Sequence, residues 1–270
     1  MSSGAKPKVG ILAGGLGSRL AEETEIRPKP MVEIGGMPLL WHIMMIYHRF
    51  GHTDFGIALG YKGDFIKRWF LEHFRHRGSF SLNTATNECT TLECGADVAI
   101  QMPAPEWNVS MIETGLATMT GGRIKRLLRW ADGERLMVTW GDGVSDIDLD
   151  RLMDFHLAHG RLVTLTAVRP PARYGHIEFD GARVAKFSEK PQTGEGWING
   201  AFFIIEPEAC EFIDSDEEMF EHAPLTRLAE AGQLMAYRHE GFWQCMDTMR
   251  EKQILQELWD GGIAPWRWWS

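Results

Sequence analysis

Short apolar runs of strand length alternate along this chain with longer segments in which apolar residues recur at helical spacing. The predicted strands cover residues 9–13, 54–60, 136–140, 162–168 and 234–239. The predicted helices cover residues 39–50, 64–77, 121–132, 148–159, 207–214, 224–231 and 248–259. The order strand, helix, strand, helix near the start is typical of a parallel sheet with helices on its faces.

Residues 80–118 have a weaker pattern. Short β-like pieces such as Phe80 to Asn83 and Val98 to Met102 lie between polar runs and two prolines. We therefore expect an antiparallel edge or flap in this region. The stretch from residue 168 to residue 187 is also rich in β-forming residues.

The first predicted strand opens into a glycine-rich loop. Its residues are Gly14, Gly15, Leu16, Gly17, Ser18 and Arg19. Glycines let main-chain N–H groups approach a phosphate closely, and Arg19 can add a charged fork to the same anion. We interpret the loop as a phosphate cradle; an ordinary glycine turn is the competing interpretation. The loop departs from a dinucleotide fingerprint because Leu20 stands where the third glycine belongs, and it lacks the lysine of a P-loop.

A lysine between two prolines follows this loop. Proline restricts its own backbone and that of the residue before it, so we expect Pro28 and Pro30 to hold Lys29 in an extended backbone. The ammonium of Lys29 can then deliver a positive charge to the anion that the glycine loop holds. A solvated lysine in a proline-rich connector is the alternative, and the neighbouring loop favours the functional interpretation.

Two aspartates are candidates for metal binding or capping. Asp142 stands between two glycines at the end of the strand 136–140, where open α/β sheets place ligands. A carboxylate there suits Mg²⁺, although an isolated aspartate of this kind can also make a turn with its own backbone. Asp247 precedes the predicted helix 248–259, and N-capping is the simple interpretation of that position.

A second lysine before a proline follows the β-rich stretch. Lys190 repeats the logic of Lys29, and Glu189 lies directly before it. Together with Asn199, these side chains offer the acceptors and donors that a polyhydroxylated ligand needs. Asn199 can equally well satisfy a turn.

Length, composition and charge limit the function classes. With 270 residues, 44% of them apolar, the chain is long enough for a sizeable core. We expect a flexible lead over residues 1–8 and a single domain over residues 9–270. The net charge of -9 argues against nonspecific binding to nucleic acid. No apolar run reaches the roughly 18 residues of a membrane helix and the start lacks a signal-peptide core, so we expect a cytoplasmic protein.

Three smaller features carry expectations of their own. The four cysteines form no C-x-x-C pair, so we expect free thiols that hold no metal. The helix 121–132 is basic, which is typical of a solvated face. The tail over residues 266–269 is rich in tryptophan, and we expect it to dock on the domain or on a second subunit.

Several stretches in order along the chain resemble one protein family. Residues 12–20, 29–32 and 35–39 resemble the sugar-1-phosphate nucleotidyltransferases, whose signature reads G-G-x-G-[ST]-R-L followed by K-P. Later stretches resemble the cytidylyltransferases within that family, namely residues 118–123, 140–143, 189–191, 198–200 and 242–248. The likeness covers nearly the whole chain.

The resemblance implies a fold, a reaction and a set of site residues. The fold is a Rossmann-like α/β domain with a mixed, mainly parallel sheet, flanking helices and a small β-rich side that binds the sugar. The reaction is transfer of the cytidylyl group of CTP to a sugar 1-phosphate, expected to be glucose 1-phosphate, in a Mg²⁺-dependent homo-oligomer. Asp142 and Asp247 are implied to hold the metal. Arg19, Lys29 and Lys190 are implied to be catalytic, and Glu189, Lys190 and Asn199 to contact the sugar phosphate. The implied nucleotide-binding residues are Leu12, Ala13, Gly14, Gly15, Gly17, Ser18, Arg19, Thr118, Gly122, Arg123 and Gly141.

Alternatives to this function stay open. The same transfer can use UTP, dTTP or another acceptor. Trp140, Trp197, Ala201 and Cys245 depart from residues common in the family, and these departures bear on the identity of the sugar more than on the chemistry. A nucleotide-dependent oxidoreductase is disfavoured by the missing third glycine. A sensor that binds without catalysis is disfavoured by the retention of Asp142 and Asp247 together with Lys190, since a sensor does not need the metal pair.

Overall fold

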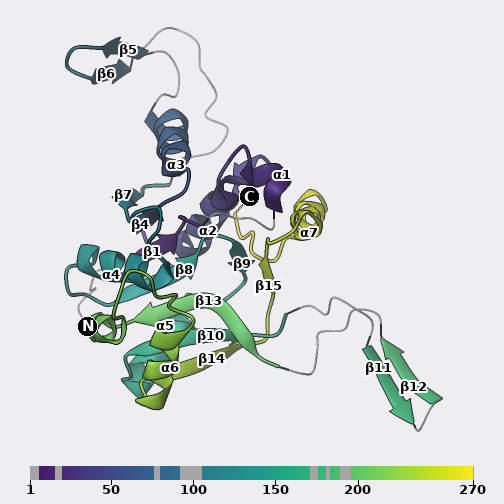
Figure 1. The fold of residues 1–270 in the computed structure, drawn as a ribbon. Coiled ribbons are helices and arrows are strands. Elements are labelled where there is room, and N and C mark those ends of the chain that lie inside the picture. The colour runs from purple at the N-terminus through teal and green to yellow at the C-terminus, as the bar shows by residue number, and fades with distance from the viewer. Residues whose placement is uncertain are drawn as a thin grey trace.

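In the computed structural model, residues 6–15, 20–75, 80–91, 105–170, 176–180, 183–188 and 196–269 are described. A seven-stranded sheet forms its centre, with the strand order β14-β10-β13-β8-β1-β4-β7 (Figure 1). The strands are β1 (Lys8–Leu12), β4 (Asp54–Leu59), β7 (Asn108–Glu113), β8 (Leu136–Trp140), β10 (Val163–Val168), β13 (Ile198–Ile205) and β14 (Leu234–His239). Within this sheet β13 is antiparallel to both of its neighbours, and the other adjacent pairs are parallel. The predicted mixed, mainly parallel sheet is thus confirmed.

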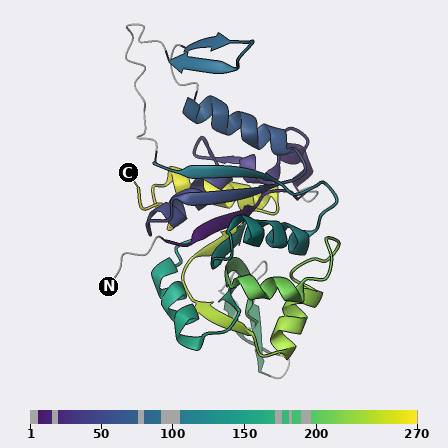
Figure 2. The same cartoon turned by 90° about the vertical axis from the view of Figure 1, so that its left-hand side faces the viewer.

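Helices cover both faces of the sheet (Figure 2). The core on one face is closed by α2 (Leu39–His48), α3 (Gly63–Phe70) and α5 (Leu149–His159). The core on the other face is closed by α4 (Thr120–Trp130), α6 (Ala223–Glu230) and the 3₁₀ helix η4 (Pro207–Phe212). Strand periodicity explains this division, because Ile11 and Leu12 are neighbours in β1 and belong to opposite cores.

The region between residues 80 and 118 is only partly as predicted. Strands β5 (Phe80–Asn83) and β6 (Glu88–Thr91) form an antiparallel hairpin, as expected. Strand β7 was missed, and it pairs in parallel with β4 at the edge of the main sheet. Its half-buried residues mix polar and apolar types, which is a weak signal in sequence. Val98 to Met102, also predicted as β, lie outside the described residues.

Strand β13, which lies between β10 and β8 in the main sheet, was not predicted either. The predicted helices and the other predicted strands lie close to their expected positions. The β-rich stretch contains the hairpin of β11 (His176–Asp180) and β12 (Arg183–Ser188). In place of the helix predicted over residues 64–77, the α-helix α3 ends at Phe70 and a π-helical turn follows over Leu71–Arg75. Within the helix predicted over residues 207–214, Pro207–Phe212 form the tighter 3₁₀ helix η4.

The tryptophan-rich tail docks on α2 of the same chain, which confirms one of the two expected positions. Trp266 is 2% exposed, and its Nε1 lies 3.4 Å from Nδ1 of His42. Trp268 donates from Nε1 to the Met45 carbonyl at 3.0 Å. Trp269 packs edge-on against Trp41 with ring centroids 5.2 Å apart. Among the helices that the structure describes, none combines the length and the apolar character of a membrane span.

Candidate active site

The glycine loop and Asp142 emerge at the same edge of the sheet. Strands β1 and β8 are parallel and in register, so Leu12 lies beside Trp140 at their carboxyl ends. Gly141 N then donates to the Leu12 carbonyl at 3.0 Å. A Cβ on Gly141 would lie 2.8 Å from Cγ of Pro30 and 2.9 Å from the Leu12 oxygen. Glycine at this position therefore lets the Lys-Pro turn approach the end of both strands.

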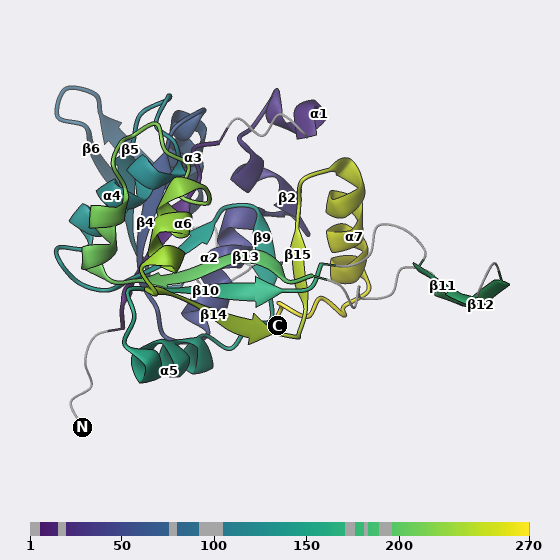
Figure 3. The ribbon, with the colours of Figure 1, turned by 60° about the horizontal axis from the view of Figure 1, so that its bottom comes forward.

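A small antiparallel ladder brings the second aspartate to the first. Strand β9 (Gly143–Ser145) pairs with β15 (Trp243–Cys245), as Figure 3 shows. Beyond the ladder, Met246 N donates to the carbonyl of Asp142 at 2.8 Å. Asp247 follows directly, so its carboxylate faces that of Asp142 although the two residues are far apart in the chain.

Lys29 lies between the two carboxylates. Its Nζ is 2.7 Å from Oδ2 of Asp142 and also donates to Oδ1 of Asp247. The side chain of Lys29 is only 12% exposed. Burial acts to lower the pKa of Lys29, but the charge of Asp142 and the hydrogen bonds to both aspartates outweigh it and hold the pKa above its ordinary 10.5. The ammonium is therefore charged at neutral pH and neutralises one of the two facing carboxylates.

The backbone at Lys29 differs from the prediction. The sequence predicts an extended residue, but Lys29 begins the 3₁₀ turn η2 (Lys29–Met31) and only Pro28 before it is extended. Met31 N donates to the Pro28 carbonyl at 2.8 Å, and Val32 N donates to the Lys29 carbonyl at 3.1 Å. These bonds and the burial of Met31 outweigh the usual preference of a residue before proline.

The N-cap residue of the last helix is Thr248. Helix α7 (Met249–Asp260) begins with a capping box, in which Glu251 N donates to Thr248 Oγ1 at 3.3 Å and Thr248 N donates to Oε2 of Glu251 at 2.9 Å. The N-cap interpretation of Asp247 is therefore wrong, because the next residue supplies the cap. The Asp247 carboxylate can then bond Lys29.

Arg123, on α4, holds the start of the glycine loop by a hydrogen bond to the Gly14 carbonyl. It is 5% exposed, and its guanidinium donates to the carbonyl of Leu59 at 2.8 Å, to that of Gly14 at 3.3 Å and to the Thr114 hydroxyl. A Cβ on Gly14 would collide with Nη1 of Arg123, and one on Gly60 would lie 2.6 Å from it. Burial lowers the pKa of Arg123, and the charge of Arg126 adds to the effect. The prediction of a solvated face is thus wrong for this residue.

Thr114 and Gly60 both contact the Arg123 guanidinium, and sequence reasoning missed them. Nothing in the sequence of this basic helix indicates that Arg123 is the arginine that is buried. Gly15 differs from Gly14, since no described atom lies within 4 Å of a Cβ placed on it. The described part of the chain therefore leaves Gly15 clear of neighbours, whereas Gly14 is packed against Arg123. A Cβ on Gly122 would lie 2.7 Å from Cγ2 of Thr118, so these two predicted residues pack together at the start of α4.

The remaining predicted site residues have different outcomes. Gly17, Ser18, Arg19, Glu189 and Lys190 lie outside the described residues, and their roles stay predictions. Asn199 Oδ1 accepts a hydrogen bond of 2.8 Å from the N–H of Ala201, whose φ is +61°. The turn interpretation of Asn199 is therefore observed, and its contact with a sugar stays a prediction.

Cys245 lies close to the two acidic residues that follow it. Its Sγ and one carboxylate oxygen each from Asp247 and Glu251 all lie within 4.8 Å of one another. Burial, followed by the charges of Glu251, Asp247 and Asp142, raises the pKa of the Cys245 thiol to about 12. The thiol is thus neutral at pH 7, and the carboxylates of Asp142 and Asp247 remain the better ligands for a hard cation.

Replacing Lys29 with methionine leaves two facing carboxylates without their counterion. We expect Lys29→Met to lower the free energy of unfolding near neutral pH by about 3 kcal/mol, measured by urea denaturation. The folded-state pKa of Lys29 is raised, so its stabilisation is complete below pH 10.5 and is lost as the pH rises through the folded value. The difference from wild type should therefore shrink only above pH 10.5.

A matched double variant separates charge repulsion from lost packing. Lys29→Met combined with Asp247→Asn removes one of the facing charges and should recover part of the lost stability. Equal stability of wild type and Lys29→Met would contradict a stabilising role for the ion cluster of Lys29, Asp142 and Asp247.

Comparison with known proteins identifies the family. A family model described as Nucleotidyl transferase matches residues 8–248. Glucose-1-phosphate cytidylyltransferase of Salmonella typhi is 46% identical, over 97% of this chain and 100% of the relative. Probable glucose-1-phosphate cytidylyltransferase of Bacillus subtilis is 36% identical with the same coverage. The crystal structure of HddC from Yersinia pseudotuberculosis shares the fold, with a TM-score of 0.68 at 23% identity over 94% of this chain and 100% of that one. This chain therefore belongs to the nucleotidyl transferase family.

Proposed function

We propose that this protein transfers the cytidylyl group of CTP to glucose 1-phosphate and releases CDP-glucose and pyrophosphate. The observation that carries the proposal is the convergence of Lys29, Asp142 and Asp247 at the sheet edge where the glycine loop begins. The two bacterial relatives, which are 46% and 36% identical over 97% of the chain, bear the name of this activity.

In the proposed reaction, a phosphate oxygen of glucose 1-phosphate attacks the α-phosphorus of CTP. A new P–O bond forms, and the bond between the α-phosphorus and the bridging oxygen breaks, so that pyrophosphate leaves with the electron pair. The attacking phosphate is already ionised near neutral pH, and no general base is required. Catalysis then depends on holding two anions in line and neutralising their charge.

The residues of the site bind the phosphate groups or hold the loop that binds them. The N–H groups of Gly14 and Gly15 bind phosphate oxygens. Arg123 keeps the loop in place through its hydrogen bond to the Gly14 carbonyl. Lys29 turns its ammonium from the two carboxylates to the triphosphate. The predicted roles of Arg19 toward the triphosphate and of Lys190 toward the sugar phosphate belong to the same proposal.

Asp142 and Asp247 fit a Mg²⁺ ion. Both are hard oxygen ligands, and both already reach a single cationic group, the Lys29 ammonium. Mg²⁺, when bound, neutralises charge on the α-phosphate and on the leaving pyrophosphate. The chain contributes two carboxylates that face the same position, and a lysine whose ammonium can move away from that position.

The proposal is tested by pyrophosphate release with Mg²⁺, with CTP, UTP, dTTP, ATP and GTP each crossed against a panel of sugar 1-phosphates. We expect release with CTP and glucose 1-phosphate above every other pair. Preference for a different nucleotide or acceptor would refute that part of the proposal and keep the chemistry. No release with any pair would favour a sensor.

Asp142→Asn keeps the size of the side chain and removes its charge. We expect kcat to fall about a thousandfold, because a carboxylate that holds the charge-neutralising cation is lost. Asp146→Asn is the matched control, since Asp146 pairs with His239 at 3.0 Å and is outside the proposed metal pair. Near-normal turnover of Asp142→Asn, or an equal loss in both variants, would contradict the metal assignment.

A further inference from the structure

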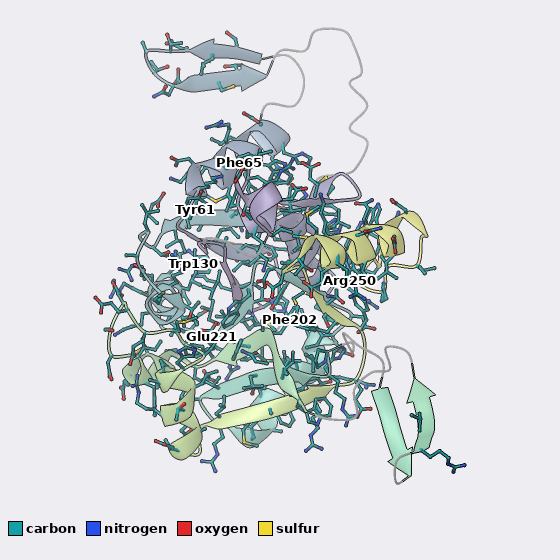
Figure 4. All side chains as sticks on the ribbon, turned by 45° about the vertical axis from the view of Figure 1, so that its right-hand side comes forward. Tyr61, Phe65, Trp130, Phe202, Glu221 and Arg250 are labelled. Atoms are coloured by element: carbon teal, nitrogen blue, oxygen red, sulfur yellow. The ribbon has the colours of Figure 1, made fainter. Side chains whose placement is uncertain are left out.

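Glu221 connects two parts of the site that the mechanism treats separately. It is labelled in Figure 4 and lies in the turn just before α6. Its Oε1 accepts a hydrogen bond of 2.8 Å from the indole N–H of Trp140. Its Oε2 accepts one of 2.5 Å from the hydroxyl of Thr120. The same Thr120 oxygen accepts from Phe220 N at 2.8 Å, so the link to α4 is doubled.

The two hydrogen-bond donors to Glu221 belong to different elements, β8 and α4. Trp140 is the last residue of β8, two positions before Asp142, and its ring packs against Phe203 with centroids 4.9 Å apart. Thr120 is the first residue of α4, the helix whose Arg123 holds the carbonyl of Gly14. One carboxylate therefore couples the strand end that presents the metal ligand to the helix that supports the glycine loop.

A carboxylate suits this position because it only accepts. Both donors must point toward it, which fixes the Trp140 ring and leaves a Thr120 lone pair for the N–H of Phe220. A glutamine has one accepting oxygen and would present an N–H group to one of the two donors. Among the ion pairs of the described residues none involves Glu221, so its hydrogen bonds in that part of the chain are to neutral donors.

We propose that Glu221 is a positioning residue for the nucleotide, acting through Thr120 and Trp140 to set the glycine loop against Asp142. The inference rests on the proposed function and adds a residue to it. Glu221 touches neither substrate nor reacting atoms in this scheme. Its loss should weaken the binding of CTP, whose triphosphate spans the loop and the Asp142 side, and should spare the sugar phosphate.

The test is the affinity for CTP with Mg²⁺ and without acceptor, measured by titration calorimetry. We expect Glu221→Ala to bind CTP about tenfold more weakly than wild type, the loss that corresponds to one hydrogen bond to a charged group. Glu221→Gln keeps one acceptor and should recover part of the affinity. The KM for glucose 1-phosphate, measured at saturating CTP, should stay within about twofold of wild type.

Glu218→Gln is the matched control for a purely structural role. Glu218 lies in the same segment between η4 and α6, and its carboxylate accepts hydrogen bonds of 2.8 Å from Nη2 of Arg227 and from Asp214 N. This variant should lower the melting temperature and leave CTP affinity unchanged. A Glu221→Ala variant that loses melting temperature but binds CTP as wild type does would overturn the proposal.

Further outcomes separate this proposal from the proposed function. Wild-type protein that binds CTP but transfers no cytidylyl group would refute the function, and weaker binding by Glu221→Ala would still support the positioning role. Equal rises in the CTP dissociation constant and the glucose 1-phosphate KM would refute a nucleotide-specific role. Wild-type protein that binds no CTP would refute both.

Discussion

The balance of charge between one lysine and two aspartates is the constraint on which the rest of the site depends. Facing carboxylates repel each other strongly when half-buried, and the ammonium of Lys29 offsets that repulsion. The glycine at position 141 and the ladder of β9 with β15 both serve to bring these three groups together. Two carboxylates that bind an ammonium group are also suited to bind a metal ion. In the proposed reaction, the Lys29 ammonium is then free to bind a phosphate group.

The glycine loop is held independently of this charge cluster. A buried arginine, Arg123, donates to the Gly14 carbonyl and to the Leu59 carbonyl at the end of β4, so its side chain supports the first glycine of the loop. The two halves meet where β1 and β8 end side by side, and Glu221 links Trp140 at the end of β8 to Thr120 at the start of α4. In the proposed reaction, the positioning of two anions then depends on contacts along this whole edge of the sheet.

Local patterns in the sequence predicted much of this arrangement. Strands with continuous apolar runs, the carboxylate between glycines at Asp142 and the lysine between prolines were all recognisable, and the family resemblance supplied Asp247. The missing parts depend on tertiary contacts: strand β7 is stabilised by pairing with β4, and Lys29 adopts a 3₁₀ turn because Met31 is buried. No local signal marks Arg123 as buried or Glu221 as bridging. The homo-oligomer, the cytoplasmic location and the lack of nucleic-acid binding stay predictions.

A crystal structure with CTP and Mg²⁺, in the absence of acceptor, tests the central claim most directly. We expect the triphosphate on the N–H groups of Gly14 and Gly15, the metal between Asp142 and Asp247, and the Lys29 ammonium on a phosphate oxygen. A triphosphate bound away from this loop, with Lys29 still bridging the two carboxylates, would contradict it.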